Sequence, residues 1–220
     1  MFIGILLVLG IVGQAQPVYT NSGTPFGMPC YKYTIKGRKH TICWTVDDHP
    51  NRATKKVLQT FRRHNLKGTF FIVGAPLRYH AKSPSRVTKT YLSLFKRIQS
   101  DGHLLANHSV THAQICKKSQ RRVHWELSAT QRLIQRYGGV TPKLFRPPHA
   151  IRCRKIRVAA RRLKLKVVMY DISDYKVPAR RMWRQLRWRV VRLKRPYTIV
   201  LIHSKYRRFE RLLDYIKRNP

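Results

Sequence analysis

Short apolar runs alternate with basic amphipathic stretches along most of this 220-residue chain. The apolar runs predict β-strands over residues 40–46, 68–73, 103–106, 143–145, 166–170 and 197–202. The stretches between them predict helices over residues 51–64, 88–100, 121–137, 152–163, 179–193 and 207–217. Because strands that alternate with helices form βα units, we expect an α/β fold with a parallel sheet, either a barrel or a doubly wound sheet.

Polar residues with possible chemistry follow these expected strands. They are Asp47 and Asp48 after the first strand, Asn107, His108 and His112 after the third, Arg146 after the fourth, Asp171 and Asp174 after the fifth, and His203 after the last. Half of the eight acidic residues in the chain fall in this set. Since parallel α/β folds build their active sites at the carboxyl ends of the strands, we expect an active site there.

The amino-terminal residues have the pattern of an export signal. An apolar run over residues 2–12 has the length of a signal-peptide core and is too short to span a bilayer comfortably, and "GQA" at 13–15 offers small residues for cleavage. We therefore expect a signal peptide over residues 1–15, a lead-in over 16–39 and one catalytic domain over 40–220. The protein would be secreted or periplasmic, with no stable membrane span. A short buried strand or an uncleaved anchor is the alternative.

The charge of the chain limits its partners. Its 47 Lys and Arg against eight acidic residues give a formal net charge of +39 at pH 7. A field of that strength predicts an anionic partner: nucleic acid, acidic lipid or an acidic cell-wall polymer. The four cysteines, Cys30, Cys43, Cys116 and Cys153, allow three full disulfide pairings, and the absence of a CxxC pair argues against a structural zinc site.

Two histidines and a carboxylate suggest a metal centre. "NHSVTHA" spaces His108 and His112 as HxxxH, which would place both imidazoles on one face of a helical turn. With one carboxylate from "VDD" they form a set that can hold Zn²⁺ and leave positions open, although non-haem iron oxygenases use the same ligand types. The second Asp of the pair could act as general base, Arg146 as the cation beside it, and His203 as general acid held by a nearby Asp.

Five stretches in this order resemble the five motifs of the NodB-homology polysaccharide deacetylases, carbohydrate esterase family 4. "TVDDHP" (45–50) resembles TFDDGP, "HSVTH" (108–112) resembles H[ST]xxH, and "RPPHA" (146–150) resembles RxPYG. "DISDY" (171–175) resembles DxxDW, and "LIH" (201–203) resembles LxH. The resemblance covers about residues 40–205 and implies a distorted (β/α) barrel, an incomplete TIM-like barrel.

The resemblance also implies roles for residues at matching positions. Asp47 would be the general base, tethered by Arg146, and His203 the general acid, oriented by Asp174. The metal ligands would be Asp48, His108 and His112, holding Zn²⁺ or another divalent transition metal. The remaining implied residues bind the substrate: Tyr175 and Leu201 would enclose the acetyl methyl group, and the backbone N–H of His149 would help to hold the oxyanion.

Several positions depart from the family pattern without removing an implied ligand, acid or base. His49 stands where the motif has Gly, and we expect it at the rim of the pocket. Ala113 replaces a common Pro, His149 and Ala150 replace Tyr and Gly, and Tyr175 replaces Trp. These changes bear on pocket shape and specificity more than on the reaction.

The sequence thus predicts a metal-dependent hydrolase that removes N-acetyl groups from GlcNAc-type residues of a polysaccharide and releases acetate. An anionic cell-wall polymer, peptidoglycan, suits the net charge better than neutral chitin, and we do not expect nucleic acid as the partner. The alternatives are an inactive basic module on the same fold that binds glycan or nucleic acid, and a deacetylase of chitin or of an O-acetylated glycan.

Overall fold

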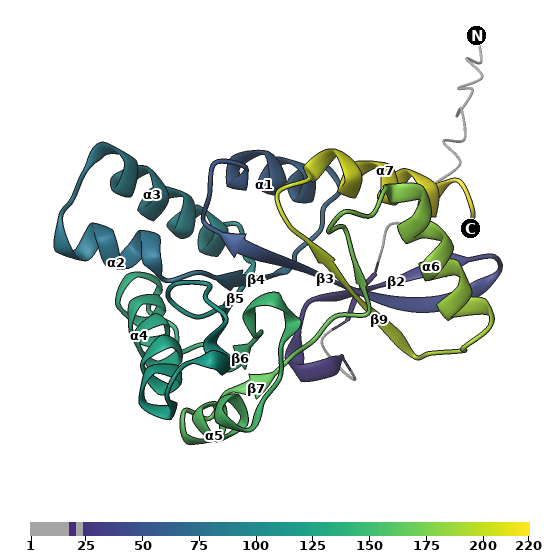
Figure 1. Cartoon of the computed structure of the whole chain (residues 1–220). Helices are drawn as coiled ribbons and strands as arrows, with labels where there is room; N and C mark the ends of the chain where they lie inside the picture. Colours follow the sequence, from purple (N-terminus) through teal and green to yellow (C-terminus); the bar gives the residue numbers. More distant parts are fainter. Residues whose placement is uncertain (1–17, 21–23) are drawn as a thin grey trace, which may run out of the picture.

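The computed structural model of the chain describes residues 18–20 and 24–220, with strands on the inside and helices around them (Figure 1). The strands are β1 (Val18–Thr20), β2 (Cys30–Ile35), β3 (Arg38–His49), β4 (Thr69–Ile72), β5 (Leu104–Asn107), β6 (Leu144–Phe145), β7 (Lys166–Val167), β8 (Ile172–Ser173) and β9 (Tyr197–Ile202). The α-helices are α1 (Thr54–Arg63), α2 (Ala75–Lys82), α3 (Arg86–Ser100), α4 (Gln120–Gly138), α5 (Arg154–Arg162), α6 (Ala179–Val191) and α7 (Tyr206–Lys217). Short 3₁₀ turns span Pro25–Gly27, Ile115–Lys117 and Pro148–Ala150.

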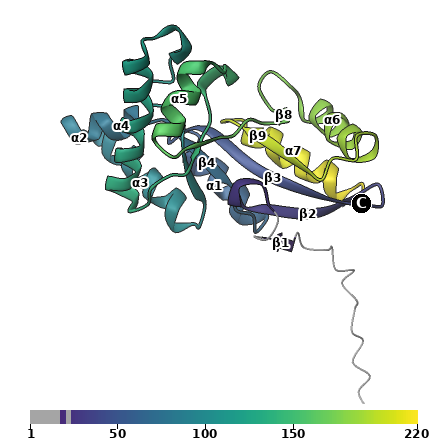
Figure 2. The same ribbon diagram turned by 90° about the horizontal axis from the view of Figure 1, so that it is seen from below.

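The sheet is a parallel ribbon that curls without closing. Its parallel strands run in the order β7, β6, β5, β4, β3, β9, β8, and the two outermost strands do not pair with each other among the described residues. The helices contact one another in the matching order α5, α4, α3, α1, α7, α6 (Figure 2). The expected parallel α/β sheet is confirmed, and of the two forms it is the distorted, incomplete barrel.

The sheet begins earlier in the chain than the expected lead-in allows. Strand β2 pairs antiparallel with β3 from Cys30 opposite Cys43 to Ile35 opposite Arg38, so part of residues 16–39 belongs to the sheet. The Cys30–Cys43 disulfide joins these two strands, and the second disulfide joins Cys116 to Cys153. The expected signal peptide, residues 1–15, lies outside the described residues. No described helix is both long and apolar enough to cross a bilayer.

The core lies between the sheet and the ring of helices. Trp44, on β3, which pairs with β2, β4 and β9, is fully buried and packs against Phe209 of α7 at 5.0 Å between ring centroids. Phe61 of α1 contacts both Phe209 and Phe70 of β4, so the helices are fixed to the strands by large aromatic side chains. This packing holds the carboxyl ends of the strands in place, and the polar residues follow those ends.

Three small strands and one helix were absent from the sequence-based expectation. Strand β8 has only two residues, and strands of that length leave no periodic signal. Helix α2 begins with Pro76 in its first turn, where proline is tolerated, although its short polar sequence has little apolar periodicity. Asp174 therefore follows β8 and not the expected strand over 166–170, which ends at Val167.

Candidate active site

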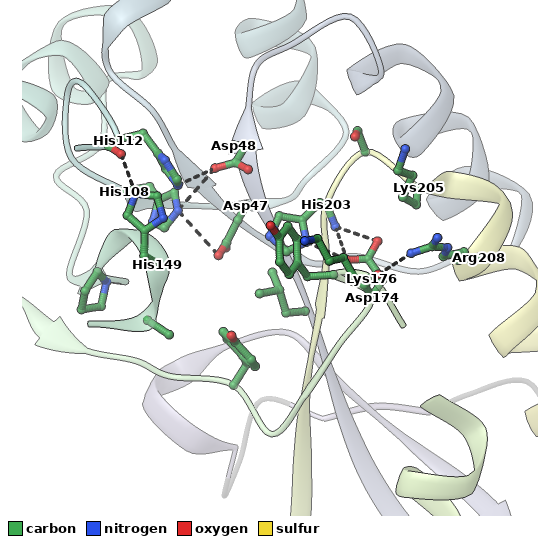
Figure 3. A pocket seen from close by; sticks show the side chains of 16 residues that line it. Asp47, Asp48, His108, His112, His149, Asp174, Lys176, His203, Lys205 and Arg208 are labelled. Carbon is green, nitrogen blue, oxygen red and sulfur yellow. Dashed lines mark hydrogen bonds and ion pairs between the residues drawn. The ribbon is translucent and has the colours of Figure 1, made fainter. Parts of the chain in front are cut away.

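One cavity of about 650 Å³ opens at the carboxyl ends of β3, β5, β6, β8 and β9 (Figure 3). Most of the residues predicted for the site line it: Asp47, Asp48, His108, His112, His149, Asp174, Tyr175, Leu201 and His203. Arg146 lies directly behind Asp47 and is fully buried. Residues far apart in sequence are thus brought together by the parallel order of the strands.

Arg146 fixes the position of Asp47. Its Nη1 donates to Asp47 Oδ1 at 2.8 Å and to the Thr45 hydroxyl at 2.9 Å. Its Nε and Nη2 donate to the backbone oxygens of Val168 and Met169, both at 3.2 Å, so the guanidinium is held on several sides. Asp47 is almost fully buried as well. A carboxylate held in this way keeps its second oxygen, Oδ2, free to point into the cavity, 3.7 Å from His108 Nε2.

Three ligand atoms meet on the other side of Asp47. Asp48 Oδ1 lies 3.1 Å from His112 Nε2 and 3.5 Å from His108 Nε2, and these atoms all lie within 4.8 Å of one another. Asp48 Oδ1 is buried and accepts no hydrogen bond of good geometry from the described residues. A buried carboxylate oxygen without a donor, facing two imidazole nitrogens, is the arrangement expected around a divalent metal ion.

The second nitrogen of His108 is already engaged. His108 Nδ1 lies 2.7 Å from the backbone oxygen of Arg146, to which it donates. This contact fixes the tautomer and leaves Nε2 with a lone pair directed at Asp48. The donor set of two imidazoles and one carboxylate therefore fits Zn²⁺ and also other divalent transition metals.

The charges within this cluster favour an ionised Asp48. Burial raises the pKa of Asp48, but the close His108 and His112 imidazoles outweigh burial and hold that pKa well below its usual value. The nearby Asp48 carboxylate in turn raises the pKa of His112. The carboxylate is the form that binds a metal ion.

His203 is the second held imidazole in the cavity. Its Nδ1 lies 2.6 Å from Oδ1 of the fully buried Asp174, and both oxygens of Asp174 accept from the His203 backbone N–H at 3.1 Å. Burial lowers the pKa of His203, while the hydrogen bond and charge of Asp174 and the charges of Asp47 and Asp48 raise it, for a net rise above 6.5. The protonated imidazole is therefore favoured, with Nε2 as its remaining donor.

The loop that carries His108 and His112 is not helical. The expected helical turn at HxxxH is wrong: residues 108–112 are irregular, with left-handed φ angles of 65° at Ser109 and 55° at His112. Despite this irregular backbone, the imidazole rings of His108 and His112 lie close together, with centroids 5.0 Å apart. Asp48 and Ala150 also have positive φ, at 66° and 56°. Non-glycine residues in this region mark strained backbone, and such strain concentrates at functional sites.

Glu126 of α4, which the sequence did not single out, shapes that loop. Its Oε2 accepts from the backbone N–H groups of Val110 and Thr111 at 2.9 Å, and its Oε1 accepts from the Thr111 hydroxyl at 2.8 Å. Arg122, one turn earlier on α4, donates to the same carboxylate. Glu126 is only 1% exposed. An acidic residue on the apolar side of an amphipathic helix was the available sequence signal.

Two other expectations need correction. His49 is fully buried and not at the rim: its Nδ1 lies 2.7 Å from the Thr54 hydroxyl, and its ring packs against Phe70. Within this stretch of β3 the positive φ, 66°, falls on Asp48 and not on His49. Asp171, which was expected at the active site, does not line the cavity. It accepts from Arg189 and from the backbone N–H of Ile199, which makes it a structural residue.

The three residues expected to bind the substrate differ in exposure. Leu201 is nearly buried in the floor, whereas Tyr175 is 64% exposed and its ring lies 6.0 Å from that of His203. His149 has a φ of 57°, and its Nε2 lies 3.1 Å from the backbone oxygen of His112. All three line the cavity, and His149 lies on the side of His108 and His112, across from His203 (Figure 3).

Comparison with known proteins identifies one family. The family profile described as "Polysaccharide deacetylase" matches residues 34–168. A "Peptidoglycan-N-acetylglucosamine deacetylase" from Bacillus cereus is 30% identical over 132 residues, 58% of this chain and 44% of the relative. The chain spans 44%, 66% and 27% of the lengths of the first three curated relatives it matches.

Solved structures agree on the fold. A "Family 4 carbohydrate esterase from Streptomyces lividans in complex with acetate" has a TM-score of 0.65 and 25% identity, covering 80% of this chain and 85% of the other. A "CE4 family pseudoenzyme from Bacillus Anthracis" has the same TM-score of 0.65 at 22% identity, covering 83% of this chain and 62% of the other. Since this fold is found both in an esterase and in a pseudoenzyme, any argument for activity has to come from the residues in the cavity.

Proposed function

Because the chain belongs to the polysaccharide deacetylase family, the NodB-homology group of carbohydrate esterase family 4, we propose that it is a metal-dependent N-deacetylase of peptidoglycan. One observation carries the proposal. A carboxylate held by a buried arginine and an imidazole held by a buried aspartate share a cavity with a three-residue metal-ligand set. A general base, a general acid and a metal site are what acetamide hydrolysis requires.

In this proposal Asp48, His108 and His112 hold the metal ion. Zn²⁺ bound there would polarise the acetamide carbonyl and make water a better nucleophile at neutral pH. The preference for Zn²⁺ over another divalent transition metal rests on the donor set of two imidazoles and one carboxylate. Asp47, adjacent in sequence but held by Arg146, stays outside the ligand set.

The two held side chains then move the protons. Asp47 accepts a proton from a water molecule while the water oxygen attacks the acetamide carbon. The backbone N–H of His149 donates to the oxyanion that forms. When the C–N bond breaks, His203 Nε2 donates its proton to the departing amine nitrogen. Asp174 holds the imidazole and stabilises its charge before that step. The products are acetate and an amino sugar, and Tyr175 and Leu201 enclose the acetyl methyl group.

Peptidoglycan is the substrate that the similarities and the charge favour together. The Bacillus cereus relative is named for deacetylation of peptidoglycan N-acetylglucosamine. Peptidoglycan carries carboxylates, which suit a protein with a net charge of +39, whereas chitin is neutral. A wall substrate also agrees with the proposal that residues 1–15 direct export, which makes the protein secreted or periplasmic.

Acetate release from peptidoglycan and from a chitin oligomer, assayed side by side on the zinc-loaded full chain, tests this proposal. We expect release from peptidoglycan at the higher kcat/KM. Release from chitin alone would keep the reaction and overturn the substrate. Release only from an O-acetylated glycan would make the protein an esterase. Metal binding and polymer binding without acetate release from any of them would favour the inactive binding module.

A further inference from the structure

Three basic side chains form one wall of the cavity. Lys176 follows β8, and Lys205 and Arg208 stand at the start of α7, all three beside His203 and away from the metal-ligand histidines (Figure 3). The family motifs do not include them, because Lys176 follows the motif at 171–175, and Lys205 and Arg208 follow the motif at 201–203. The proposed mechanism gives them no role in moving protons or holding metal.

None of these three cations has an acidic side chain within ion-pair distance in the described part of the chain. Arg208 Nη1 donates to the backbone oxygen of Asp174 at 2.6 Å, which fixes its position without neutralising its charge. Lys176 Nζ lies 5.5 Å from the ring centroid of Tyr175. Lys205 is exposed at the mouth of the cavity.

The carboxylates of the cavity cannot neutralise this wall, because each already has another partner. Asp47 is paired with Arg146, Asp174 with His203, and Asp48 faces the two metal-ligand imidazoles. The charge of the cavity is therefore divided: Asp47 and Asp48 lie next to the metal-ligand histidines, and the three cations lie beside His203 (Figure 3). An acetylated sugar without other substituents offers this basic wall nothing to pair with.

We propose that Lys176, Lys205 and Arg208 bind an anionic group of the glycan, a carboxylate or a phosphate ester, next to the acetamide that reacts. This inference rests on the proposed function, since it places the sugar between the metal ligands and His203. The wall lies on the side of His203, which donates to the amine, so the anionic group belongs to the reacting sugar or to its neighbour on that side. The carboxylate of a muramic acid unit has the required chemistry.

Paired substrates that differ only in charge isolate this contact. We would measure kcat/KM on a muramic acid-containing oligosaccharide and on its carboxyl-reduced twin, and in a second arm on a phosphorylated and an unphosphorylated N-acetylglucosamine oligomer. In each arm the result is the ratio of kcat/KM on the charged substrate to kcat/KM on its neutral counterpart. The ratio in the first arm reports binding of a carboxylate, and the ratio in the second arm reports binding of a phosphate ester. The wild-type protein should show at least one ratio well above one at low salt, and that ratio should shrink as salt is added.

Matched variants locate the effect. K176Q and K205Q should each lower the charged-to-neutral ratio about two- to fivefold, the range of an exposed ion pair, and the double variant should lower it further, to what Arg208 alone supports. K176R/K205R should restore the ratio. The control is K89Q/K96Q, which removes the same charge from the exposed face of α3, a helix that α1 separates from α7 (Figure 1). Arg208 is left unchanged because it contacts the backbone of Asp174.

The outcomes separate this inference from the proposed function. A double variant that releases acetate with the wild-type ratio, or a control that loses as much, would overturn the inference alone. If the wild-type protein releases no acetate from any glycan, the proposed function fails. In that case, calorimetry measures the affinity of the same variants for the same substrate pairs. The charged-to-neutral ratio of these affinities then tests the inference in place of the ratio of kcat/KM.

Discussion

At the scale of single residues, the site depends on two adjacent aspartates that have different partners. Asp47 and Asp48 follow each other in the chain, but the positive φ of Asp48 turns the second carboxylate toward the histidines while Arg146 holds the first. The loop after them is held by Asn51, whose side-chain amide donates to the backbone oxygen of Asp48 at 2.8 Å. Adjacent like charges are thereby kept apart, each with its own partner.

Asp47→Asn should abolish most of the acetate release while leaving metal binding intact. The amide cannot accept a proton from water, and removal of a general base costs about 10²- to 10⁴-fold in kcat. Asparagine keeps an oxygen that can accept from Arg146, so the buried guanidinium retains a partner. Acetate release and metal content are measured on the same sample. Activity within a few-fold of the wild type would show that Asp47 is not the base.

Asp174→Asn should move the alkaline limb of the pH profile of kcat/KM to lower pH. The acid must be protonated to act, and activity is lost as the pH rises through the pKa of His203. Asp174 raises that pKa above 6.5, so removing its charge lowers the pKa and activity is lost at a lower pH. Asp171→Asn is the matched control, because Asp171 pairs with Arg189 outside the cavity. An alkaline limb that stays in place would exclude His203 as the acid.

At the scale of elements, each site residue depends on the strand or helix that presents it. Helix α4 reaches the metal-ligand loop through Glu126, whose carboxylate accepts from the backbone of Val110 and Thr111. The loop between His108 and His112 is not helical, and this carboxylate holds it together with the backbone N–H groups of Gly74 and Ala75, which donate to Ser109 and Val110. Such outer partners commonly set the affinity of a metal site.

Glu126→Gln should therefore weaken metal binding about 10- to 100-fold. The affinity is measured by competition with a coloured chelator, independently of acetate release. Glu210→Gln makes the same chemical change on α7, where Glu210 accepts from Thr60 and Arg63, and should leave the affinity unchanged. Equal affinities in the wild type and Glu126→Gln would mean that the loop holds its shape without this carboxylate.

The elements that carry the motifs could be predicted from the sequence because their signals are local. The run that ends in Val46 and the run that ends in Ile202 are long and apolar, and both are buried strands of the sheet. Strand β2 could not be predicted, because Gly and Pro surround it and its pairing with β3 forms only in the folded protein. The loop conformation at His108–His112 was mispredicted because i, i+4 spacing suggests a helix, whereas Glu126 stabilises an irregular turn.

The site residues also divide into those with a local sequence signal and those whose roles depend on tertiary contacts. Asp47, Asp48 and His203 could be identified because each follows an apolar run and matches a motif. Glu126 and the three cations of the cavity wall could not, since their roles arise from contacts between α4 or α7 and distant loops. The burial of His49 depends on Thr54 and Phe70, which surround it only in the folded protein.

At the scale of the whole molecule, the net charge of +39 should make the reaction on an anionic polymer depend on salt. The screening length falls from about 10 Å at 0.1 M ionic strength to about 3 Å at 1 M, so attraction over the surface is lost. We expect kcat/KM on peptidoglycan to fall steeply with added salt while that on a chitin oligomer changes little. Equal salt dependence on both polymers would remove the charge argument for peptidoglycan.

The central claim is that Asp48, His108 and His112 hold a metal ion on which deacetylation depends. The most direct measurement is acetate release from peptidoglycan by the full chain as purified, after chelation and dialysis, and after Zn²⁺ is restored, with metal content measured at each stage. We expect the purified chain to be active, to lose activity when the metal is removed, and to recover it when about one Zn²⁺ per chain is bound again. Full acetate release from a sample shown to contain no metal would contradict it.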